Sequence, residues 1–266
     1  MPTEYVFDSA SDLGDEQIRS LSALYDDVTA TVLDGIGVRS GQICLDIGAG
    51  SGSVATMLAE RVTPDGSVIA TDLESAHLTT GPGVTVLTHD INEGVPPGGP
   101  YDLIHARLVL MHLEAREQLL PMLAGGLNPG GWLAIGDLGA RLPRAIEAPS
   151  PADAALFERV IRIGMTVLAP KVGMSTRWAE LLHRSMSEAG LIDVQTRRIA
   201  RTCAGGSPGC LVFRSYARQL EGLLQEVGVS GDEVGRFVEL MSDPRMRVEF
   251  FELIYVSGRT PGGVMA

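Results

Sequence analysis

The sequence predicts an α/β protein built around a mostly parallel sheet. Short apolar runs at 43–47, 67–73 and 101–106 alternate along the chain with longer stretches in which apolar residues recur at helical spacing. The first apolar run leads directly into a glycine-rich turn, and strands of parallel sheets read as such continuous apolar runs. With 266 residues, the chain is long enough for one domain of this class with additions.

The most informative segment is the first strand with its turn, ICLDIGAGSGS at 43–53. Gly48, Gly50 and Gly52 let the backbone bend tightly and approach a ligand closely. A helix is expected at 54–62, before the breaker Thr-Pro-Asp-Gly. A dinucleotide fingerprint would have its third glycine where this chain has Ser53. A glycine turn that binds no ligand is the other alternative.

Two further strands are expected to end beside acidic residues. The run at 67–73 contains Asp72 at its tip, where a carboxylate accepts hydrogen bonds from both hydroxyls of a ribose. Asp72 also suits the N-cap of a following helix. The run at 84–90 ends at Asp90, a residue type that is equally common in ordinary turns. A Tyr-Asp pair opens the fourth strand at 101–106, and the turn Leu-Asn-Pro-Gly-Gly at 127–131 leads into a fifth.

These pieces, in this order across residues 43–138, resemble the class I S-adenosylmethionine-dependent methyltransferases, in their bacterial branch of quinone and natural-product enzymes. The resemblance implies a Rossmann-like sheet of seven mostly parallel strands with helices on both faces. It implies S-adenosyl-L-methionine as the cofactor. The contacts that it implies are Tyr25, Asp46, Gly48, Ala49, Gly50, Gly52, Asp72, Leu73, Asp90, Ile91, Ala106 and Arg107.

Helical additions are expected around this core, within a single domain spanning 1–266. An amphipathic helix at 15–34 belongs to an N-terminal cap (1–40), followed by the cofactor-binding core (41–140). Helical insertions at 141–190 and 203–250 follow the fifth and sixth strands and are expected to form the substrate cap. Their expected helix starts are Ser150-Pro151, Ser207-Pro208, Ser230 and Asp243-Pro244.

In the methyltransferases that the sequence resembles, an N-terminal helix folds over the cofactor and places aromatic side chains near the methionine carboxylate of the cofactor. Tyr5, Phe7 and Tyr25 are the candidates in this chain. Packing of Tyr25 on the sheet is the alternative.

Three side chains are candidates for catalysis. His112 follows the fourth strand, and an imidazole with its ordinary pKa near 6.5 accepts a proton at neutral pH. A structural role near the cofactor is the alternative for this histidine. Asp137, just after the fifth strand, would orient a hydroxyl or amine. Arg107 would stabilise an anionic substrate or pair with an acidic residue of the N-terminal helix.

Charge and composition exclude several classes of function. The net charge of −12 disfavours a nucleic-acid partner, because phosphate backbones require a basic surface. No apolar run approaches the roughly 20 residues that span a bilayer, and the N-terminus lacks a signal-peptide pattern, so a cytoplasmic protein with no membrane partner is expected. Cys44, Cys203 and Cys210 have no metal-ligand spacing, so no metal site is predicted. A homodimer remains an open option.

The predicted function is methyl transfer to a small-molecule acceptor, and O-methylation of a hydroxylated secondary metabolite is favoured. C- or N-methylation, or use of the cofactor fold for cyclisation or binding alone, are the alternatives. A nicotinamide-dependent reductase is disfavoured, because position 53 is not glycine and the single lysine, Lys171, is not part of a Tyr-x-x-x-Lys pair.

Overall fold

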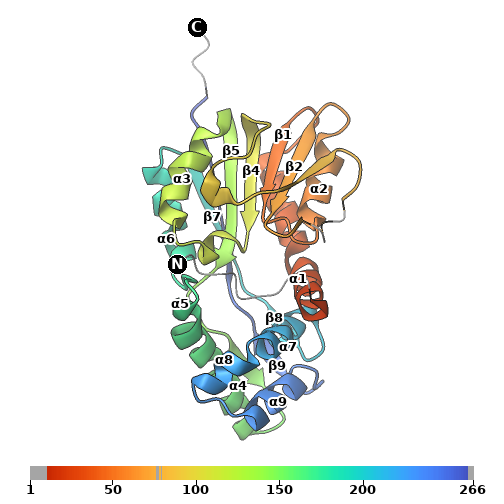
Figure 1. Cartoon of the computed structure of the whole chain (residues 1–266), viewed down its shortest axis with the longest axis vertical. Coiled ribbons are helices and arrows are strands. Elements are labelled where there is room, and N and C mark those ends of the chain that lie inside the picture. The colour runs from red at the N-terminus through yellow and green to blue at the C-terminus, as the bar shows by residue number, and fades with distance from the viewer. Residues whose placement is uncertain (1–10, 76–77, 79, 263–266) are drawn as a thin grey trace. The chain divides into compact units, whose positions relative to one another are not determined.

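A computed structural model describes residues 11–75, 78 and 80–262 (Figure 1). The chain divides into two compact units. Unit 1 comprises the chain up to Tyr25 together with Gly139–Thr176 and Ile199–Leu253. Unit 2 comprises Asp26–Leu138, Arg177–Arg198 and the chain from Ile254 onwards. The single domain spanning 1–266, with its cap and insertion boundaries, stays a prediction.

Unit 2 contains a seven-stranded sheet with strand order β3-β2-β1-β4-β5-β10-β7. Its strands are β1 (Ile43–Ile47), β2 (Ser67–Asp72), β3 (Val84–Thr88), β4 (Tyr101–Arg107), β5 (Leu127–Leu138), β7 (Ile192–Ile199) and β10 (Leu253–Arg259). The pairs β1–β2, β2–β3, β1–β4 and β4–β5 are all parallel. The predicted fold, a Rossmann-like and mostly parallel sheet, is confirmed.

Because the first five strands run parallel, their carboxyl ends lie along one edge of the sheet. Asp46 pairs with His105 across β1 and β4, and Ala106 pairs with Ile135 across β4 and β5. The buried residues of the sheet are mostly apolar, and β1, β2 and β4 each contain four or more buried residues within their short length. Ligands of open α/β sheets bind outside this carboxyl edge.

Helices and short helical turns of unit 2 connect these strands. The second half of α1 (Asp12–Ile36) belongs to unit 2, and α2 (Ser53–Val62) packs on β1, β2 and β3 (Figure 1). The turns η2 (Ile91–Glu93) and η3 (Leu110–His112) follow β3 and β4. Helices α3 (Arg116–Gly125) and α6 (Trp178–Glu188) pack against each other and against β5.

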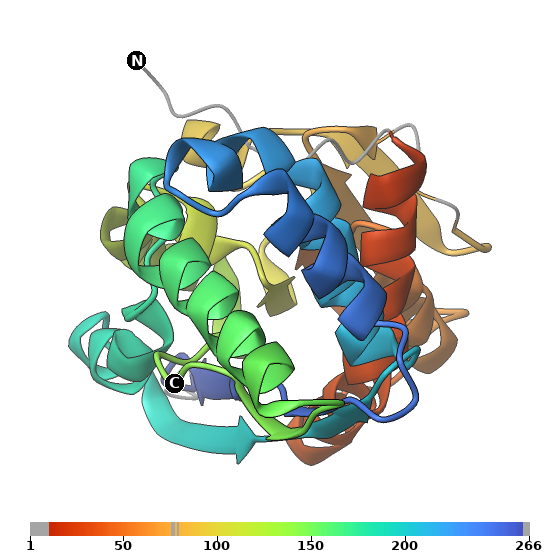
Figure 2. The same cartoon turned by 90° about the horizontal axis from the view of Figure 1, so that it is seen from below.

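Unit 1 combines a small sheet with helices. Strands β6 (Arg144–Glu147), β9 (Arg247–Glu249) and β8 (Thr202–Ala204) form an antiparallel sheet in that order. Its helical segments are α4 (Pro151–Ile163), η4 (Gly164–Leu168), α5 (Ala169–Lys171), α7 (Pro208–Gln219), α8 (Glu221–Glu226) and α9 (Gly231–Leu240). Figure 2 shows α4 in green and α7 to α9 in blue within this unit. The Phe157 ring stacks on Phe237 and meets Phe213 edge-on.

The predicted starts of three unit 1 helices are confirmed. Ser150 accepts from the Asp153 amide ahead of Pro151, Ser207 precedes Pro208, and Ser230 forms a complete capping box with Glu233. The helix expected from Asp243-Pro244 is wrong. The Asp243 side chain accepts a hydrogen bond from the Arg245 amide in a tight turn. The chain then enters β9, which pairs with β6 on one side and with β8 on the other.

Candidate active site

The glycine turn after β1 has the conformation that its sequence predicts. Gly48, Gly50 and Gly52 have φ values of 63°, 54° and 79°. All three lie in the left-handed region, which residues other than glycine rarely adopt. A Cβ atom at Gly48 would lie 2.3 Å from Cγ2 of Val109, in the segment after β4. The turn therefore requires glycine both for its dihedral angles and for the close approach of two strand ends.

Asp72 at the tip of β2 faces the same turn. One carboxylate oxygen accepts from the Gly50 amide at 2.9 Å, and the other accepts from the Glu74 amide at 3.2 Å. Leu73 beside it keeps 55% of its surface exposed, which is unusual for a large apolar side chain. A carboxylate tied to the glycine turn and an exposed apolar side chain therefore stand together at the edge of the sheet.

Asp90 and Ile91 occupy the turn after β3. The Asp90 carboxylate accepts from both the backbone amide and the side-chain amide of Asn92 at 2.9 Å, and so caps η2. Ile91 is buried. The capping role is thus observed, while the contact with a cofactor stays a prediction.

Arg107 ends β4, directly after the buried residue Ala106. Its guanidinium donates to Oγ1 of Thr29 at 2.8 Å and to the carboxylate of Asp26 at 2.9 Å, both on α1. Of the two roles predicted for Arg107, the structure contains the ion pair with an acidic residue of the N-terminal helix. The next residue, Leu108, has φ 60°, an uncommon conformation for a bulky side chain.

Asp137 and His112 lie near the carboxyl ends of β5 and β4, and both are perturbed by burial. Asp137 is fully buried, and this desolvation raises the pKa of its carboxyl to about 8. The amides of Met111 and Val109, the Arg116 guanidinium and the Trp178 indole oppose that shift. Neither carboxylate oxygen reaches hydrogen-bond geometry with the described residues. Asp137 is therefore largely protonated at pH 7.

Burial also lowers the pKa of the His112 imidazole to about 4, with a smaller contribution from the Arg116 cation. The ring is therefore neutral at pH 7. A neutral imidazole accepts a proton, as the predicted base must, but the lowered pKa makes it a weaker base than an ordinary histidine.

Tyr25 belongs to unit 1, where its side chain is 1% exposed and packs edge-on against Phe250. Tyr25 is therefore a packed core residue of unit 1, and both its predicted cofactor contact and its predicted packing on the sheet stay predictions. Tyr5 and Phe7 lie outside the described residues.

Sequence reasoning missed His105 and Tyr255. His105 is buried in the middle of β4, where its Nδ1 lies 2.7 Å from the Asp46 carboxylate, and its Nε2 bonds the hydroxyl of Tyr255 on β10. A histidine among the apolar residues of a predicted core strand was the available signal. Its partner on β10 lies 150 residues further along the chain and left no local mark.

The described part of the chain contains no group of three or more histidine, cysteine or acidic side chains arranged to hold a metal ion. Its three cysteines are buried and free, and desolvation raises the pKa of the Cys44 thiol to about 12. No described helix combines the length and apolar character needed to cross a bilayer.

Most of the chain matches a known family. A family model described as "Methyltransferase domain" matches residues 19–196, from α1 through the sheet to β7. The chain belongs to this family. The predicted family, enzyme class and cofactor are thereby confirmed: the protein is an S-adenosylmethionine-dependent methyltransferase.

Individual relatives agree with this assignment. The methyltransferase is 30% identical to trans-aconitate 2-methyltransferase of Methylobacterium radiotolerans over 183 residues, which cover 61% of this chain and 70% of that enzyme. It is 34% identical to methyltransferase str3 of Strobilurus tenacellus over 96 residues, 35% of this chain and 34% of that protein. The match thus spans about a third of the str3 protein.

The fold also agrees with a solved structure. Haemonchus contortus phosphoethanolamine N-methyltransferase 2, in complex with S-adenosyl-L-methionine, superposes with a TM-score of 0.57 at 15% identity. The match covers 95% of this chain and 58% of that enzyme.

The residues of the glycine turn fit this cofactor. Positions 48, 50 and 52 have no side chains and positive φ, so none of these three residues places a side chain between the backbone and a ligand. Asp72 supplies two acceptor oxygens at the tip of the next strand, and Leu73 an exposed apolar surface. When bound, the cofactor supplies an electrophilic methyl group on sulfur. The chain itself must align the acceptor atom and exclude water.

Proposed function

We propose that this methyltransferase acts on a small molecule and methylates an oxygen of a hydroxylated metabolite. The observation that carries the proposal is the neutral imidazole of His112, since transfer to a hydroxyl requires removal of its proton. The net charge of −12 supports a small acceptor rather than a nucleic acid. The cytoplasmic location and a homodimer stay predictions.

Within this proposal, the cofactor is bound along the carboxyl edge of the sheet. The contacts are the glycine turn at 48–52, Asp72 and Leu73 after β2, Asp90 and Ile91 after β3, and Ala106 with Arg107 at the end of β4. Tyr25 and Asp46 complete the proposed set. The hydrogen bond between Asp72 and the Gly50 amide of the turn, and the exposed side chain of Leu73, support this assignment.

A small carboxylic acid is the second candidate acceptor. The relative from Methylobacterium radiotolerans, 30% identical across 183 residues, is named for trans-aconitate. A carboxylate is already ionised at neutral pH and needs no base.

Transfer of a labelled methyl group from S-adenosylmethionine to three acceptor series tests the proposal. The series are phenols and other alcohols, carboxylic acids including trans-aconitate, and primary amines. Labelled ethers support the proposal, and labelled esters support the second candidate. Label found only on nitrogen or carbon would overturn O-methylation.

Replacing His112 with alanine is expected to lower kcat by about 100-fold with a hydroxylated acceptor, because general-base catalysis contributes on that scale. Affinity for S-adenosylmethionine should stay the same. The pH dependence of kcat/KM should show its acidic limb near pH 4, where the ring gains its proton, rather than near 6.5.

His183→Ala is the matched control for this experiment. His183 is exposed on α6, and its ring bonds the Thr196 hydroxyl, so removal of the ring should leave kcat unchanged. Normal turnover of His112→Ala at saturating acceptor would assign His112 to structure instead.

Asp72→Ala is expected to weaken S-adenosylmethionine binding by about 100-fold, because it removes a charged acceptor of two hydrogen bonds. Calorimetric titration measures the change. Glu74→Ala, two residues further along and exposed, is the control and should bind normally. Unchanged affinity of the Asp72 variant would show that the ribose is held elsewhere.

A further inference from the structure

A chain of buried hydrogen bonds begins at Asp46, the last residue but one of β1. Its Oδ1 accepts from Nδ1 of His105 on β4 at 2.7 Å. Since Nδ1 carries that proton, Nε2 of a neutral ring accepts from the Tyr255 hydroxyl on β10. Asp46, His105 and Tyr255 are at most 2% exposed. Three strands that are distant in sequence are thus joined through polar side chains inside the sheet.

The same chain of bonds continues into helix α1. The hydroxyls of Tyr255 and Thr29 share a hydrogen bond at 3.3 Å, and Thr29 is completely buried. Arg107 then donates to Thr29 at 2.8 Å and to Oδ1 of Asp26 at 2.9 Å. All of these residues belong to unit 2.

The last bond returns to the glycine turn. The Ser53 hydroxyl donates to Oδ1 of Asp26 at 3.2 Å, and Ser53 is the first residue of α2. Asp46 lies two residues before Gly48, and Ser53 directly follows Gly52. The bonds therefore form a circuit whose two ends flank the turn, running Asp46, His105, Tyr255, Thr29, Arg107, Asp26 and Ser53.

The ring of Tyr255 packs closely against the backbone of β5 at a glycine. Position 136 is glycine, and a Cβ atom there would lie 2.8 Å from Cε2 of that ring. The His105 and Tyr255 rings also stack, with centroids 5.9 Å apart. The tyrosine is therefore fixed by packing as well as by its hydroxyl.

We propose that this circuit holds the glycine turn in its cofactor-binding conformation, with Tyr255 and Thr29 as positioning residues for S-adenosylmethionine. The proposal rests on the assignment of the cofactor to the glycine turn under the proposed function. Tyr255 and Thr29 act through Asp46 and Ser53, at the two ends of the turn.

The physical reason lies in the flexibility of the turn itself. A turn with three glycines can adopt many backbone conformations. A ligand that binds a single conformation must offset the entropy that the turn loses when the other conformations are no longer populated. Restraints at positions 46 and 53 reduce that loss before the ligand arrives. Asp46 adds a further feature, because its Oδ2 is buried and has no hydrogen-bond partner among the described residues. The circuit fixes that carboxylate beside the turn.

Tyr255→Phe and Thr29→Val each interrupt the circuit while preserving most of the side-chain volume. Both variants are expected to bind S-adenosylmethionine roughly three- to tenfold more weakly in calorimetric titration, because each removes a hydroxyl that makes two hydrogen bonds of the circuit. Faster hydrogen exchange of the amides at 48–53 should accompany the loss. Thr29→Ser retains the hydroxyl and is expected to restore affinity.

Tyr101→Phe is the matched control for lost stability. Tyr101 is also completely buried in unit 2, but its hydroxyl donates to the backbone carbonyls of Pro96 and Pro97 rather than to the circuit. This variant should lower Tm comparably yet bind the cofactor normally. Each variant is titrated below its own measured Tm, so that unfolding does not contribute.

The results separate this proposal from the assignment on which it rests. If Asp72→Ala weakens binding while Tyr255→Phe and Thr29→Val bind as tightly as the parent, the circuit proposal is overturned and the cofactor site stands. If Asp72→Ala also binds normally, the site assignment itself fails. Equal weakening in Tyr101→Phe would reduce the effect to general stability and would likewise overturn the circuit.

Discussion

Replacing Gly48 with alanine is expected to reduce the affinity for S-adenosylmethionine by at least about 100-fold. The residue has φ 63°, a left-handed conformation that costs an alanine roughly 1–2 kcal/mol. The added Cβ would also lie 2.3 Å from Cγ2 of Val109, and a β-branched side chain has few alternative rotamers. The turn must therefore open or shift, which changes the backbone that faces the cofactor.

Calorimetric titration with S-adenosylmethionine measures this loss, and circular dichroism establishes that the variant is folded. Gly125→Ala is the control, because Gly125 lies in the last turn of α3 and a Cβ atom there meets no other atom within 4 Å. Its affinity should equal that of the parent. Parent-like binding by the Gly48 variant would show that the cofactor does not depend on the conformation of this turn.

Asp137→Asn is expected to stabilise the protein increasingly as the pH rises from about 4 to about 8. The folded-state pKa of this carboxyl is raised to about 8, above the ordinary value of 3.8 that applies in the unfolded chain. Between these values the folded state holds a proton that the unfolded state has lost. Stability of the parent therefore falls with rising pH, by up to about 1.4 kcal/mol per pH unit from this group. Asparagine resembles the protonated acid and does not titrate.

Urea unfolding at pH 5, 7 and 9 measures the effect as a difference in free energy between the variant and its parent. Asp153→Asn is an informative contrast in unit 1. A hydrogen bond from Arg236 holds the pKa of Asp153 below its usual value, so its stabilising contribution is present at neutral pH and lost on acidification. Removing Asp153 should destabilise the protein at pH 7. A difference for Asp137→Asn that does not change with pH would show that this carboxyl titrates normally.

The core of the fold was predictable because its signals are local. The strand at 43–47 and its turn are specified by neighbouring residues: apolar side chains suit a buried strand, and glycines suit the positive φ angles that the structure contains. The same holds for the capping box at Ser230 and Glu233, which lie three residues apart. The family match from 19 to 196 covers the region where these signals are densest.

Properties that depend on distant residues were less accessible. The sequence left two roles open for Arg107, and only the fold brings it to Asp26, 81 residues earlier. The Trp178 indole, which opposes the rise in the pKa of Asp137, lies on α6, 41 positions further along the chain. The predicted helix after Asp243 failed for the same reason, because strand pairing with β6 and β8 overrides local preference.

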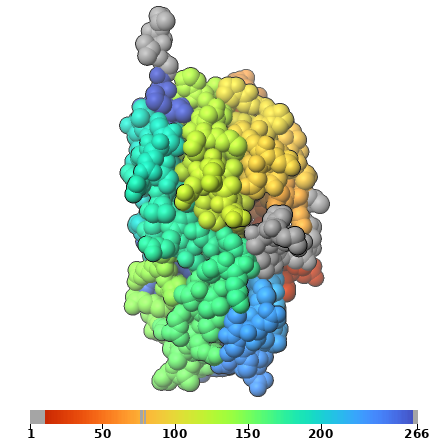
Figure 3. Space-filling model, turned by 60° about the vertical axis from the view of Figure 1, so that its left-hand side comes forward, coloured from red at the N-terminus to blue at the C-terminus, as the bar shows by residue number. Residues whose placement is uncertain are grey.

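The hydrophobic side chains of the helical insertions illustrate another limit. Phe157 and Phe213 pack with each other in the core of unit 1, whereas Trp178 belongs to unit 2. Figure 3 shows the outer surface of unit 1, where green atoms of the α4 segment border blue atoms from α8 and α9. Helical periodicity identifies such residues as buried and does not separate core from binding surface.

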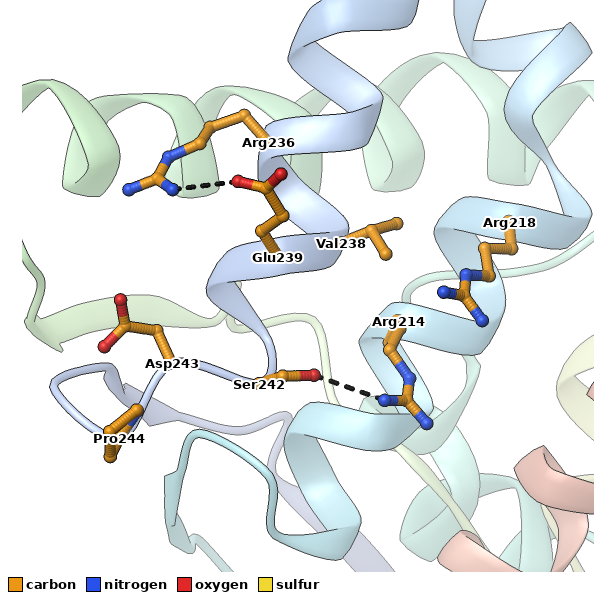
Figure 4. A pocket seen from close by; sticks show the side chains of 8 residues that line it. All are labelled: Arg214, Arg218, Arg236, Val238, Glu239, Ser242, Asp243 and Pro244. Atoms are coloured by element: carbon orange, nitrogen blue, oxygen red, sulfur yellow. Dashed lines mark hydrogen bonds and ion pairs between the residues drawn. The ribbon is translucent and has the colours of Figure 1, made fainter.

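The hollow in unit 1 drawn in Figure 4 contains charged side chains instead of aromatic ones. Arg236 bonds Glu239 and Asp153, and Arg214 bonds Ser242 and Glu16. The guanidinium groups of Arg236 and Arg214 are therefore already bound by acidic neighbours in this hollow.

The place of β10 in the sheet has a consequence for how the protein is made. This strand lies between β5 and β7, yet the ribosome produces it after both, and after the whole of the intervening helical segment. Until it emerges, β7 has no neighbouring strand, and domains that depend on such long-range pairing form slowly. Because Tyr255 lies on this strand, a nascent chain acquires its glycine turn well before it acquires the tyrosine that restrains it. A newborn molecule is therefore expected to bind its methyl donor with full affinity only after this strand has left the exit tunnel.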